Sequence, residues 1–305
     1  MNRYQNYPDT PTRPHNYFKL EGKKIHISHP EVSSGIDIHY VEKGEGSPLV
    51  LIHGLMTSSY SFRYIIDELS KTYRVIVPDL PGAGRSAAPR QLSMSAESMG
   101  EAILGIIQAL KLEKPYIVGN SLGGYQAAWF AINHPESLGK LMILHSPGIP
   151  EPKLYLLENA LKIPGTESIF RLLVKKPEFF VVNAQHYKDD LTMSKEEARE
   201  YGSIFHDRDR THLFYKLLKY SMSPTKMKTY QERLAEMFKA GSWKVPVHLL
   251  WATKDVMVDP ASGPKYQKLF PGAKLNWVED SSHFLQVDAP NRTIREIISF
   301  DTESS

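Results

Sequence analysis

The stretch Val118-Gly119-Asn120-Ser121-Leu122-Gly123-Gly124 joins two segments of different character. Before Ser121, residues 115–118 form a short apolar run with β-branched side chains, which predicts a buried strand. After it, residues 122–133 are rich in alanine and aromatic residues and contain no proline, which predicts a helix. The stretch is therefore expected to form a sharp turn between a strand and a helix.

A serine at the tip of such a turn adopts a strained backbone conformation, and the residues two positions to either side must be small. Gly119 and Gly123 occupy these two positions. The turn is expected to lift the hydroxyl of Ser121 out of the sheet. It also places the amide of Leu122 at a helix N-terminus, where a developing oxyanion is stabilised.

The composition limits the classes of protein to which the chain can belong. With 305 residues, 41% hydrophobic and 23% charged, it is expected to be a soluble globular protein. The absence of cysteine excludes a disulfide framework, a thiolate metal site and a cysteine nucleophile. The net charge of +3 comes without a block of lysine or arginine, which argues against a nucleic-acid partner.

The N-terminal residues 1–20 contain no apolar core of signal-peptide length, and no 18 consecutive apolar residues occur anywhere. We therefore expect no transmembrane segment and a cytoplasmic location. The sequence leaves the oligomeric state open.

Apolar runs and helical stripes alternate along most of the chain, and this alternation predicts a mostly parallel sheet flanked by helices. The predicted strands are residues 24–28, 36–42, 48–52, 74–77, 115–118, 141–144, 245–251 and 275–278, the first two antiparallel, and the predicted helices are residues 60–69, 95–112, 122–133, 262–269 and 292–300.

The alternation pauses after Gly148, where only amphipathic helices follow until about Trp243. We therefore predict an extended arm at residues 1–22, an α/β core at residues 23–149 and 244–305, and an inserted helical cap at residues 150–243.

A serine hydroxyl is a poor nucleophile at neutral pH and needs a base, which in turn needs an orienting acid. Two candidates follow strands of the predicted sheet, where functional groups collect. Asp255 follows the strand ending near Trp251, and His283 follows the strand ending at Val278. The order Ser, Asp, His along the chain is the order that a parallel-sheet hydrolase uses.

Five motifs in this order resemble those of the α/β-hydrolase fold family: HG at 53–54, DLPGAGRS at 79–86, GNSLGG at 119–124, WATKD at 251–255 and SHF at 282–284. The resemblance implies that Ser121 is the nucleophile, Asp255 the acid and His283 the base. It also implies an oxyanion hole made by the backbone amides of Leu55 and Leu122. No cofactor and no metal are implied.

Other polar residues near these motifs have simpler roles. His53 is expected to support the oxyanion loop, Asp79 to brace its own loop, and His145 to be a core histidine. Asp259 and Asp280 are expected to be solvated loop residues.

The substrate is less clearly indicated than the fold. The sequence resembles those of haloalkane dehalogenases and epoxide hydrolases, but these enzymes need a carboxylate nucleophile where this chain has Ser121. Epoxide hydrolases also tend to carry proline at the position of Met56. The GNSLGG turn resembles that of carbon–carbon bond hydrolases acting on ring-cleavage products, although these usually carry tryptophan at the position of Phe284.

We therefore expect a serine hydrolase that cleaves small-molecule carboxylic esters with an apolar acyl or alkyl part through an acyl-enzyme on Ser121, with Met56 and Phe284 beside the substrate. Carbon–carbon hydrolysis and a non-catalytic receptor are the alternatives. The aromatic residues of the cap are expected to form mainly its own core, and any of its arginines Arg171, Arg199, Arg208 and Arg210 that points inward would favour the carbon–carbon reaction.

Overall fold

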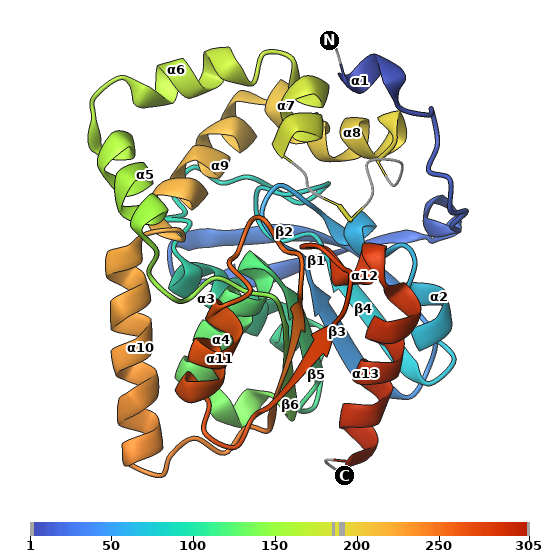
Figure 1. The fold of residues 1–305 in the computed structure, drawn as a ribbon, viewed down its shortest axis with the longest axis vertical. Helices are drawn as coiled ribbons and strands as arrows, with labels where there is room; N and C mark the ends of the chain where they lie inside the picture. The colour runs from blue at the N-terminus through green and yellow to red at the C-terminus, as the bar shows by residue number, and fades with distance from the viewer. Residues whose placement is uncertain (1–2, 185–186, 189–192, 304–305) are drawn as a thin grey trace.

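The computed structural model describes residues 3–184, 187–188 and 193–303. Its centre is an eight-stranded sheet in the order β1-β2-β4-β3-β5-β6-β7-β8 (Figure 1). β1 pairs antiparallel with β2, and β2 with β4, while all later neighbours are parallel. The strands are β1 Gly22–His29, β2 Val32–Lys43, β3 Ser47–Ile52, β4 Tyr73–Pro78, β5 Tyr116–Asn120, β6 Lys140–Leu144, β7 Val247–Ala252 and β8 Lys274–Val278. The predicted mostly parallel sheet, with an antiparallel pair at its start, is confirmed.

The central strands are apolar on both faces because helices cover both sides of the sheet. In β3, Leu49 and Leu51 pack into one hydrophobic cluster, whereas Val50 and Ile52 pack into the other, and all four are fully buried. The first cluster includes α2 Ile66–Leu69, α12 Leu285–Asp288 and α13 Pro290–Glu303. The second includes α3 Ala96–Ala109, α4 Leu122–Asn133, α10 Pro224–Lys239 and α11 Ser262–Leu269. The predicted helices at residues 122–133 and 262–269 match the observed bounds.

The predicted single helix at residues 60–69 is wrong. The chain forms a 3-10 helix η2 at Ser59–Phe62, then turns, and only afterwards the short α2. The amide and hydroxyl of Ser59 both donate to Asp79 Oδ1, at 2.8 and 2.7 Å. These bonds hold the start of the segment against the loop after β4, and its backbone bonds then span three residues instead of four.

Between β6 and β7 the chain is helical, as expected. Its helices are α5 Pro152–Lys162, α6 Thr166–Leu173, α7 Pro177–Ala184, α8 Lys195–Gly202, η5 Ser203–His206, α9 Arg208–Tyr220 and α10. α5 to α9 lie above the sheet, whereas α10 runs down its flank (Figure 1). There Tyr230 of α10 packs edge-on against Tyr125 of α4, with ring centroids 4.9 Å apart. Of the helical insertion, α10 therefore packs against the core, whereas α5 to α9 lie over the sheet (Figure 1).

The N-terminal segment connects the helical insertion to the core. It contains the helical turns α1 Arg3–Asn6 and η1 Tyr17–Lys19, so it is not wholly extended. Its carbonyls at Pro8 and Asp9 accept bonds from the first two amides of α8, at 2.9 and 3.0 Å. The segment therefore satisfies backbone donors that a helix N-terminus leaves free.

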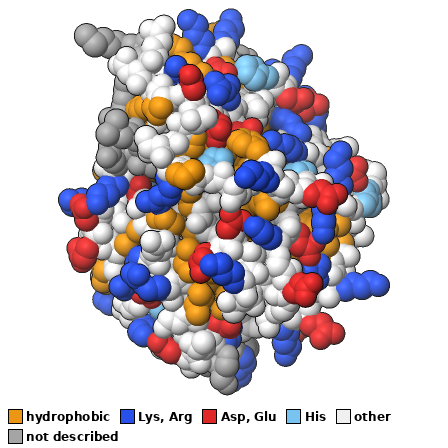
Figure 2. Space-filling model, turned by 90° about the vertical axis from the view of Figure 1, so that its right-hand side faces the viewer, with side chains coloured by type: hydrophobic (Ala, Val, Ile, Leu, Met, Phe, Trp, Pro, Cys, Tyr) orange, Lys and Arg blue, Asp and Glu red, His pale blue; other side chains and the backbone are white. Residues whose placement is uncertain are grey.

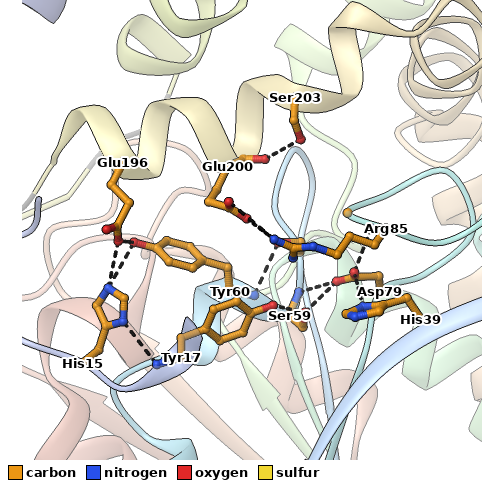
Figure 3. Close-up of polar contacts among 12 residues, drawn as sticks. His15, Tyr17, His39, Ser59, Tyr60, Asp79, Arg85, Glu196, Glu200 and Ser203 are labelled. Carbon is orange, nitrogen blue, oxygen red and sulfur yellow. Dashed lines mark hydrogen bonds and ion pairs between the residues drawn. The ribbon is translucent and has the colours of Figure 1, made fainter. Parts of the chain in front are cut away.

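α8 presents a row of glutamates to the core (Figure 3). Glu196 accepts from Tyr60 Oη at 2.6 Å, and Glu200 pairs with Arg85 at 3.2 Å. Between them, Glu197 forms an ion pair of 2.8 Å with Arg63 in which both side chains are fully buried. These contacts fix the insertion over the loops at the carboxyl ends of the strands.

The surface face in Figure 2 carries basic and acidic side chains interspersed, with hydrophobic ones scattered between them. Within the part of the chain that the structure describes, no helix is both long and apolar enough to span a bilayer.

Candidate active site

Ser121 lies between the end of β5 and the start of α4, at φ 52° and ψ −128°. This backbone conformation is strained for a residue with a side chain. The neighbouring glycines explain how the turn fits. A Cβ on Gly119 would lie 2.5 Å from the Cα of Gly124, and a Cβ on Gly123 would lie 2.4 Å from the carbonyl oxygen of His53. The crowding expected from the sequence is therefore present, and any larger residue at either position would displace backbone.

His283 bridges the serine and an aspartate. Its Nε2 lies 2.7 Å from Ser121 Oγ, and its Nδ1 lies 2.6 Å from Asp255 Oδ2. The three residues come from the turns after β5, β8 and β7, all at the carboxyl edge of the sheet. All three are buried. The arrangement can take a proton from the serine hydroxyl and stabilise the resulting imidazolium.

Asp255 is held by its own turn as well as by His283. Its Oδ1 accepts from the amides of Met257 at 2.7 Å and Val258 at 3.0 Å. Burial by itself would raise the pKa of Asp255, but the charge and hydrogen bond of His283, with the neighbouring His145 and the Val258 amide, lower it below its usual value. The carboxylate is therefore ionised at neutral pH.

The other two candidate acids lie elsewhere. Asp259 is exposed and accepts from the amide of Ala261 at 2.9 Å. Asp280 is exposed and pairs with Lys254 at 2.6 Å and with Lys188. Their expected roles as solvated loop residues agree with these contacts.

His145 lies next to Asp255 Oδ2, the same carboxylate oxygen that faces His283. Its Nδ1 accepts from the amide of Ala252 at 2.8 Å, so its proton is on Nε2. Nε2 lies 2.9 Å from the carbonyl oxygen of Val258 and 3.2 Å from Asp255 Oδ2. Burial lowers the pKa of His145 to about 4, which keeps the ring neutral. It is a buried core histidine, as expected, and its Nε2 hydrogen bond goes to the Val258 carbonyl beside the aspartate.

The loop after β3 lies against the serine. A Cβ on Gly54 would come within 3.0 Å of Ser121 Cβ. His53 supports this loop, because its Nδ1 donates to the carbonyl of Gly54 at 2.9 Å and its Nε2 accepts from the amide of Leu80 at 3.0 Å. Burial lowers the pKa of His53, so it is neutral. The backbone of Leu55 thus follows directly on a residue in contact with Ser121.

Asp79 braces its loop, as expected, and Figure 3 shows how. Its carboxylate accepts from Ser59, from the amide of Arg85 at 2.9 Å, and lies 2.9 Å from His39 Nδ1. Burial alone would raise the pKa of Asp79, but these bonds and the nearby His53 lower it. The residue is fully buried and every contact is structural, so it holds the loop of residues 79–86 in place.

An apolar cavity lies next to this site, between the core and the insertion. Core residues from the loops after β3 and β4 and from α3 and α4 form most of its lining, and the insertion adds three apolar side chains. The described lining consists of His53, Gly54, Met56, Thr57, Leu80, Pro81, Gly82, Ala83, Met94, Met99, Leu122, Gln126, Ile204, Phe214 and Leu217.

Met56 and Leu122 line this cavity, as the sequence suggests for the former. Phe284 is not among the described lining residues. Its ring packs edge-on against His283, with centroids 5.0 Å apart, and against Tyr187 at 5.2 Å. That Phe284 contacts the substrate stays a prediction.

Some aromatic residues of the insertion line the cavity, and others do not. Phe214 lines the cavity, whereas Phe170 stacks on the ring of Phe214 and Phe205 packs edge-on against it. None of the four arginines of the insertion is among the described lining residues. Arg210 instead donates to the carbonyl of Gly84 at 2.8 Å, and Arg171 pairs with Glu167.

Comparison with known proteins agrees with this geometry. A family model described as alpha/beta hydrolase fold matches residues 47–290. The chain belongs to the α/β hydrolase fold family, and it is a hydrolase of that fold.

Relatives of several specificities are similar to it. Epoxide hydrolase 3 from Xenopus tropicalis is 28% identical over 88% of this chain and 76% of that protein. A 2-hydroxy-6-oxononadienedioate/2-hydroxy-6-oxononatrienedioate hydrolase from Burkholderia vietnamiensis is 26% identical over 88% of this chain and 92% of that protein. Among solved structures, an esterase from Thermogutta terrifontis superimposes with a TM-score of 0.74, at 18% identity, over 92% of this chain and 99% of that one.

Sequence reasoning missed Gln126, Met94, Met99, Ile204 and Leu217 as lining residues. Gln126 could have been found, because it is four positions after Leu122 on a predicted helix and must share its face. The others come from distant segments, and no local pattern marks them.

Proposed function

We propose that this protein cleaves carboxylic esters through an acyl-enzyme intermediate on Ser121. The observation that carries the proposal is the continuous chain of hydrogen bonds from Ser121 Oγ through His283 to Asp255, of 2.7 and 2.6 Å. Asp255 orients the imidazole and stabilises its charged form, and His283 acts as general base and then as general acid.

In the first half of the reaction, Ser121 Oγ attacks the ester carbonyl carbon while its proton moves to His283 Nε2. The carbonyl oxygen becomes an oxyanion that accepts from the backbone amides of Leu122 and Leu55. Collapse of this intermediate breaks the bond to the leaving alcohol, which takes the proton from Nε2. In the second half, water loses a proton to Nε2 and attacks the acyl carbon, and the proton then returns to Ser121 as the acid leaves.

The apolar cavity supports an ester with an apolar acyl part. It begins at Gly54 and Leu122, beside the proposed oxyanion position, and most of its described lining is aliphatic or aromatic. Burial of apolar surface there contributes binding energy in proportion to the area removed from water. In this proposal α5 to α9 form the lid, the segment of residues 1–22 anchors it, and α10 belongs with the core flank.

A second candidate is hydrolysis of a carbon–carbon bond in a ring-cleavage product. Similarity to relatives named as hydrolases of 2-hydroxy-6-oxo dienoates favours it. Against it stands the described cavity lining, which offers no cationic side chain to a substrate carboxylate. Epoxide opening is disfavoured, because the carboxylate nucleophile that it needs is replaced by Ser121.

Two measurements test the proposal. A fluorophosphonate should label the wild-type protein on Ser121, as located by mass spectrometry, and should leave Ser121→Ala unlabelled. A protein that resists labelling would be a receptor and not an enzyme. Offered p-nitrophenyl butyrate and a vinylogous diketone from ring cleavage separately, the protein should turn over the ester with the higher kcat/KM. Faster specific turnover of the diketone would replace the ester proposal with the second candidate.

A further inference from the structure

Gln126 has a buried amide that the protein itself leaves without a hydrogen-bond partner. The residue is only 2% exposed, and it lines the apolar cavity. Among the described residues, none forms a hydrogen bond with its side chain, although many other buried polar groups in the core are paired. A primary amide can donate two hydrogen bonds and accept two. Leaving such a group unpaired in an apolar environment is unfavourable, which points to a partner that comes from outside the chain.

The other polar side chains of the described lining are already satisfied. His53 uses both ring nitrogens, one with Gly54 and one with Leu80. The hydroxyl of Thr57 donates to the carbonyl of Gly54 at 3.0 Å. Gln126 therefore stands out among the cavity residues that the structure describes as the side chain with free hydrogen-bonding capacity.

The position of Gln126 on α4 relates it to the reaction centre. It lies four residues after Leu122, so both project from one face of the helix, about one turn or roughly 5.4 Å apart along the axis. The amide of Leu122 is the proposed oxyanion donor. A substrate whose carbonyl oxygen lies there would extend its acyl chain past Leu122 toward Gln126.

We propose that Gln126 selects acyl groups that carry a hydrogen-bonding oxygen several carbons from the ester carbonyl, such as a keto group. This inference rests on the proposed function, and it makes the preferred substrate an oxo-ester instead of a plain fatty ester. The amide N–H groups donate to the keto oxygen, while the aliphatic segment between the two carbonyls contacts side chains such as Met99 and Leu217. A plain acyl chain fills the same space but leaves Gln126 without a partner, and sites of this kind discriminate against the analogue that lacks the polar group.

The experiment compares p-nitrophenyl heptanoate with its 4-oxo, 5-oxo and 6-oxo derivatives, in each of which one CH₂ group of the acyl chain is replaced by C=O. For the wild-type protein, we expect kcat/KM for at least one oxo-ester to exceed that for the plain ester by about 10- to 100-fold. In Gln126→Met, an unbranched apolar replacement, this ratio should fall to within about threefold of one. Gln108→Met makes the same chemical change on the exposed side of α3 and should keep the wild-type ratio.

Each outcome bears on the inference. No preference for any oxo-ester in the wild-type protein, or an unchanged preference in Gln126→Met, would overturn it, and an ordered water on Gln126 would then explain the amide. If Gln126→Met does not fold, as judged by thermal unfolding, Gln126→Leu replaces it. The ratio of kcat/KM between oxo-ester and plain ester in the wild-type protein tests the inference without any variant. Labelling of Ser121 by a fluorophosphonate together with a flat oxo-ester series would reject only the role of Gln126. Absence of labelling would reject the proposed function itself.

Discussion

His283 Nδ1 lies 2.6 Å from Asp255 Oδ2, while the carboxylates of Asp259 and Asp280 are engaged by Ala261 and by two lysines. One of three nearby acids is thus selected by geometry. Asp255 is also the one that is buried and held by two backbone amides, which fix the direction in which it accepts the imidazole proton.

We expect Asp255→Asn to lower kcat by up to ~10⁴, because an amide donor at this position favours the imidazole tautomer that cannot accept the proton of Ser121. The measurement is steady-state hydrolysis of p-nitrophenyl butyrate. Asp259→Asn is the matched control and should change kcat by less than about threefold, since its side chain only bonds to its own turn. Similar losses in the two variants would contradict the assignment.

His145 should make the protein less stable in acid. Its pKa is about 4 in the folded state and 6.5 in the unfolded chain, so the unfolded state binds the proton first as the pH falls. The free energy of unfolding should therefore decrease between pH 6.5 and 4, by ~3 kcal/mol in total. In His145→Gln, this part of the pH dependence should disappear in urea unfolding curves.

Asp288 works in the opposite direction, because burial raises its pKa to about 6. Its contribution is present in both proteins and cancels when His145→Gln is compared with the wild type. If the free energy of unfolding of His145→Gln decreases as steeply as that of the wild type when the pH is lowered from 6.5 to 4, His145 is not the responsible group.

The buried ion pair Arg63–Glu197 should contribute far more to the free energy of unfolding than an exposed ion pair does. Glu197→Leu leaves the guanidinium of Arg63 buried and unpaired, which should lower the free energy of unfolding by about 3–5 kcal/mol. The control is the pair Arg90–Asp209, whose side chains are half exposed. Asp209→Asn should cost less than about 1 kcal/mol. If the two variants lose equal free energy of unfolding in chemical denaturation, the packing of α8 against the core does not depend on the Arg63–Glu197 pair.

Leu217 should set the size of the acyl group. It contributes part of the cavity wall from α9, so Leu217→Ala enlarges the space and should raise kcat/KM for p-nitrophenyl octanoate relative to butyrate by about tenfold. Leu172→Ala, on an exposed position of α6, serves as control and should leave that ratio unchanged. A ratio unaffected by Leu217→Ala would place the acyl group outside this cavity.

The amino-acid sequence by itself determined the parallel sheet, the strand-to-helix turn at Ser121 and the order of the three candidate catalytic residues. These features rest on local patterns: continuous apolar runs, helical stripes, and glycines at positions where a Cβ would meet backbone within 2.4–2.5 Å. The helix α4 was predicted to the residue for the same reason, because its start is fixed by the turn and its end by Pro135, which keeps His134 out of the helical conformation.

Only the tertiary structure decided which long-range partners meet. The segment of residues 60–69 has a helical pattern, but Asp79, 20 residues after Ser59, bonds to it and shortens its first turn. α10 continues the helical insertion in sequence, yet its apolar stripe is buried against Tyr125 of the core. The free amide of Gln126 becomes visible only when the cavity around it is known, because a hydrogen bond that is missing depends on every neighbour and not on the residue itself.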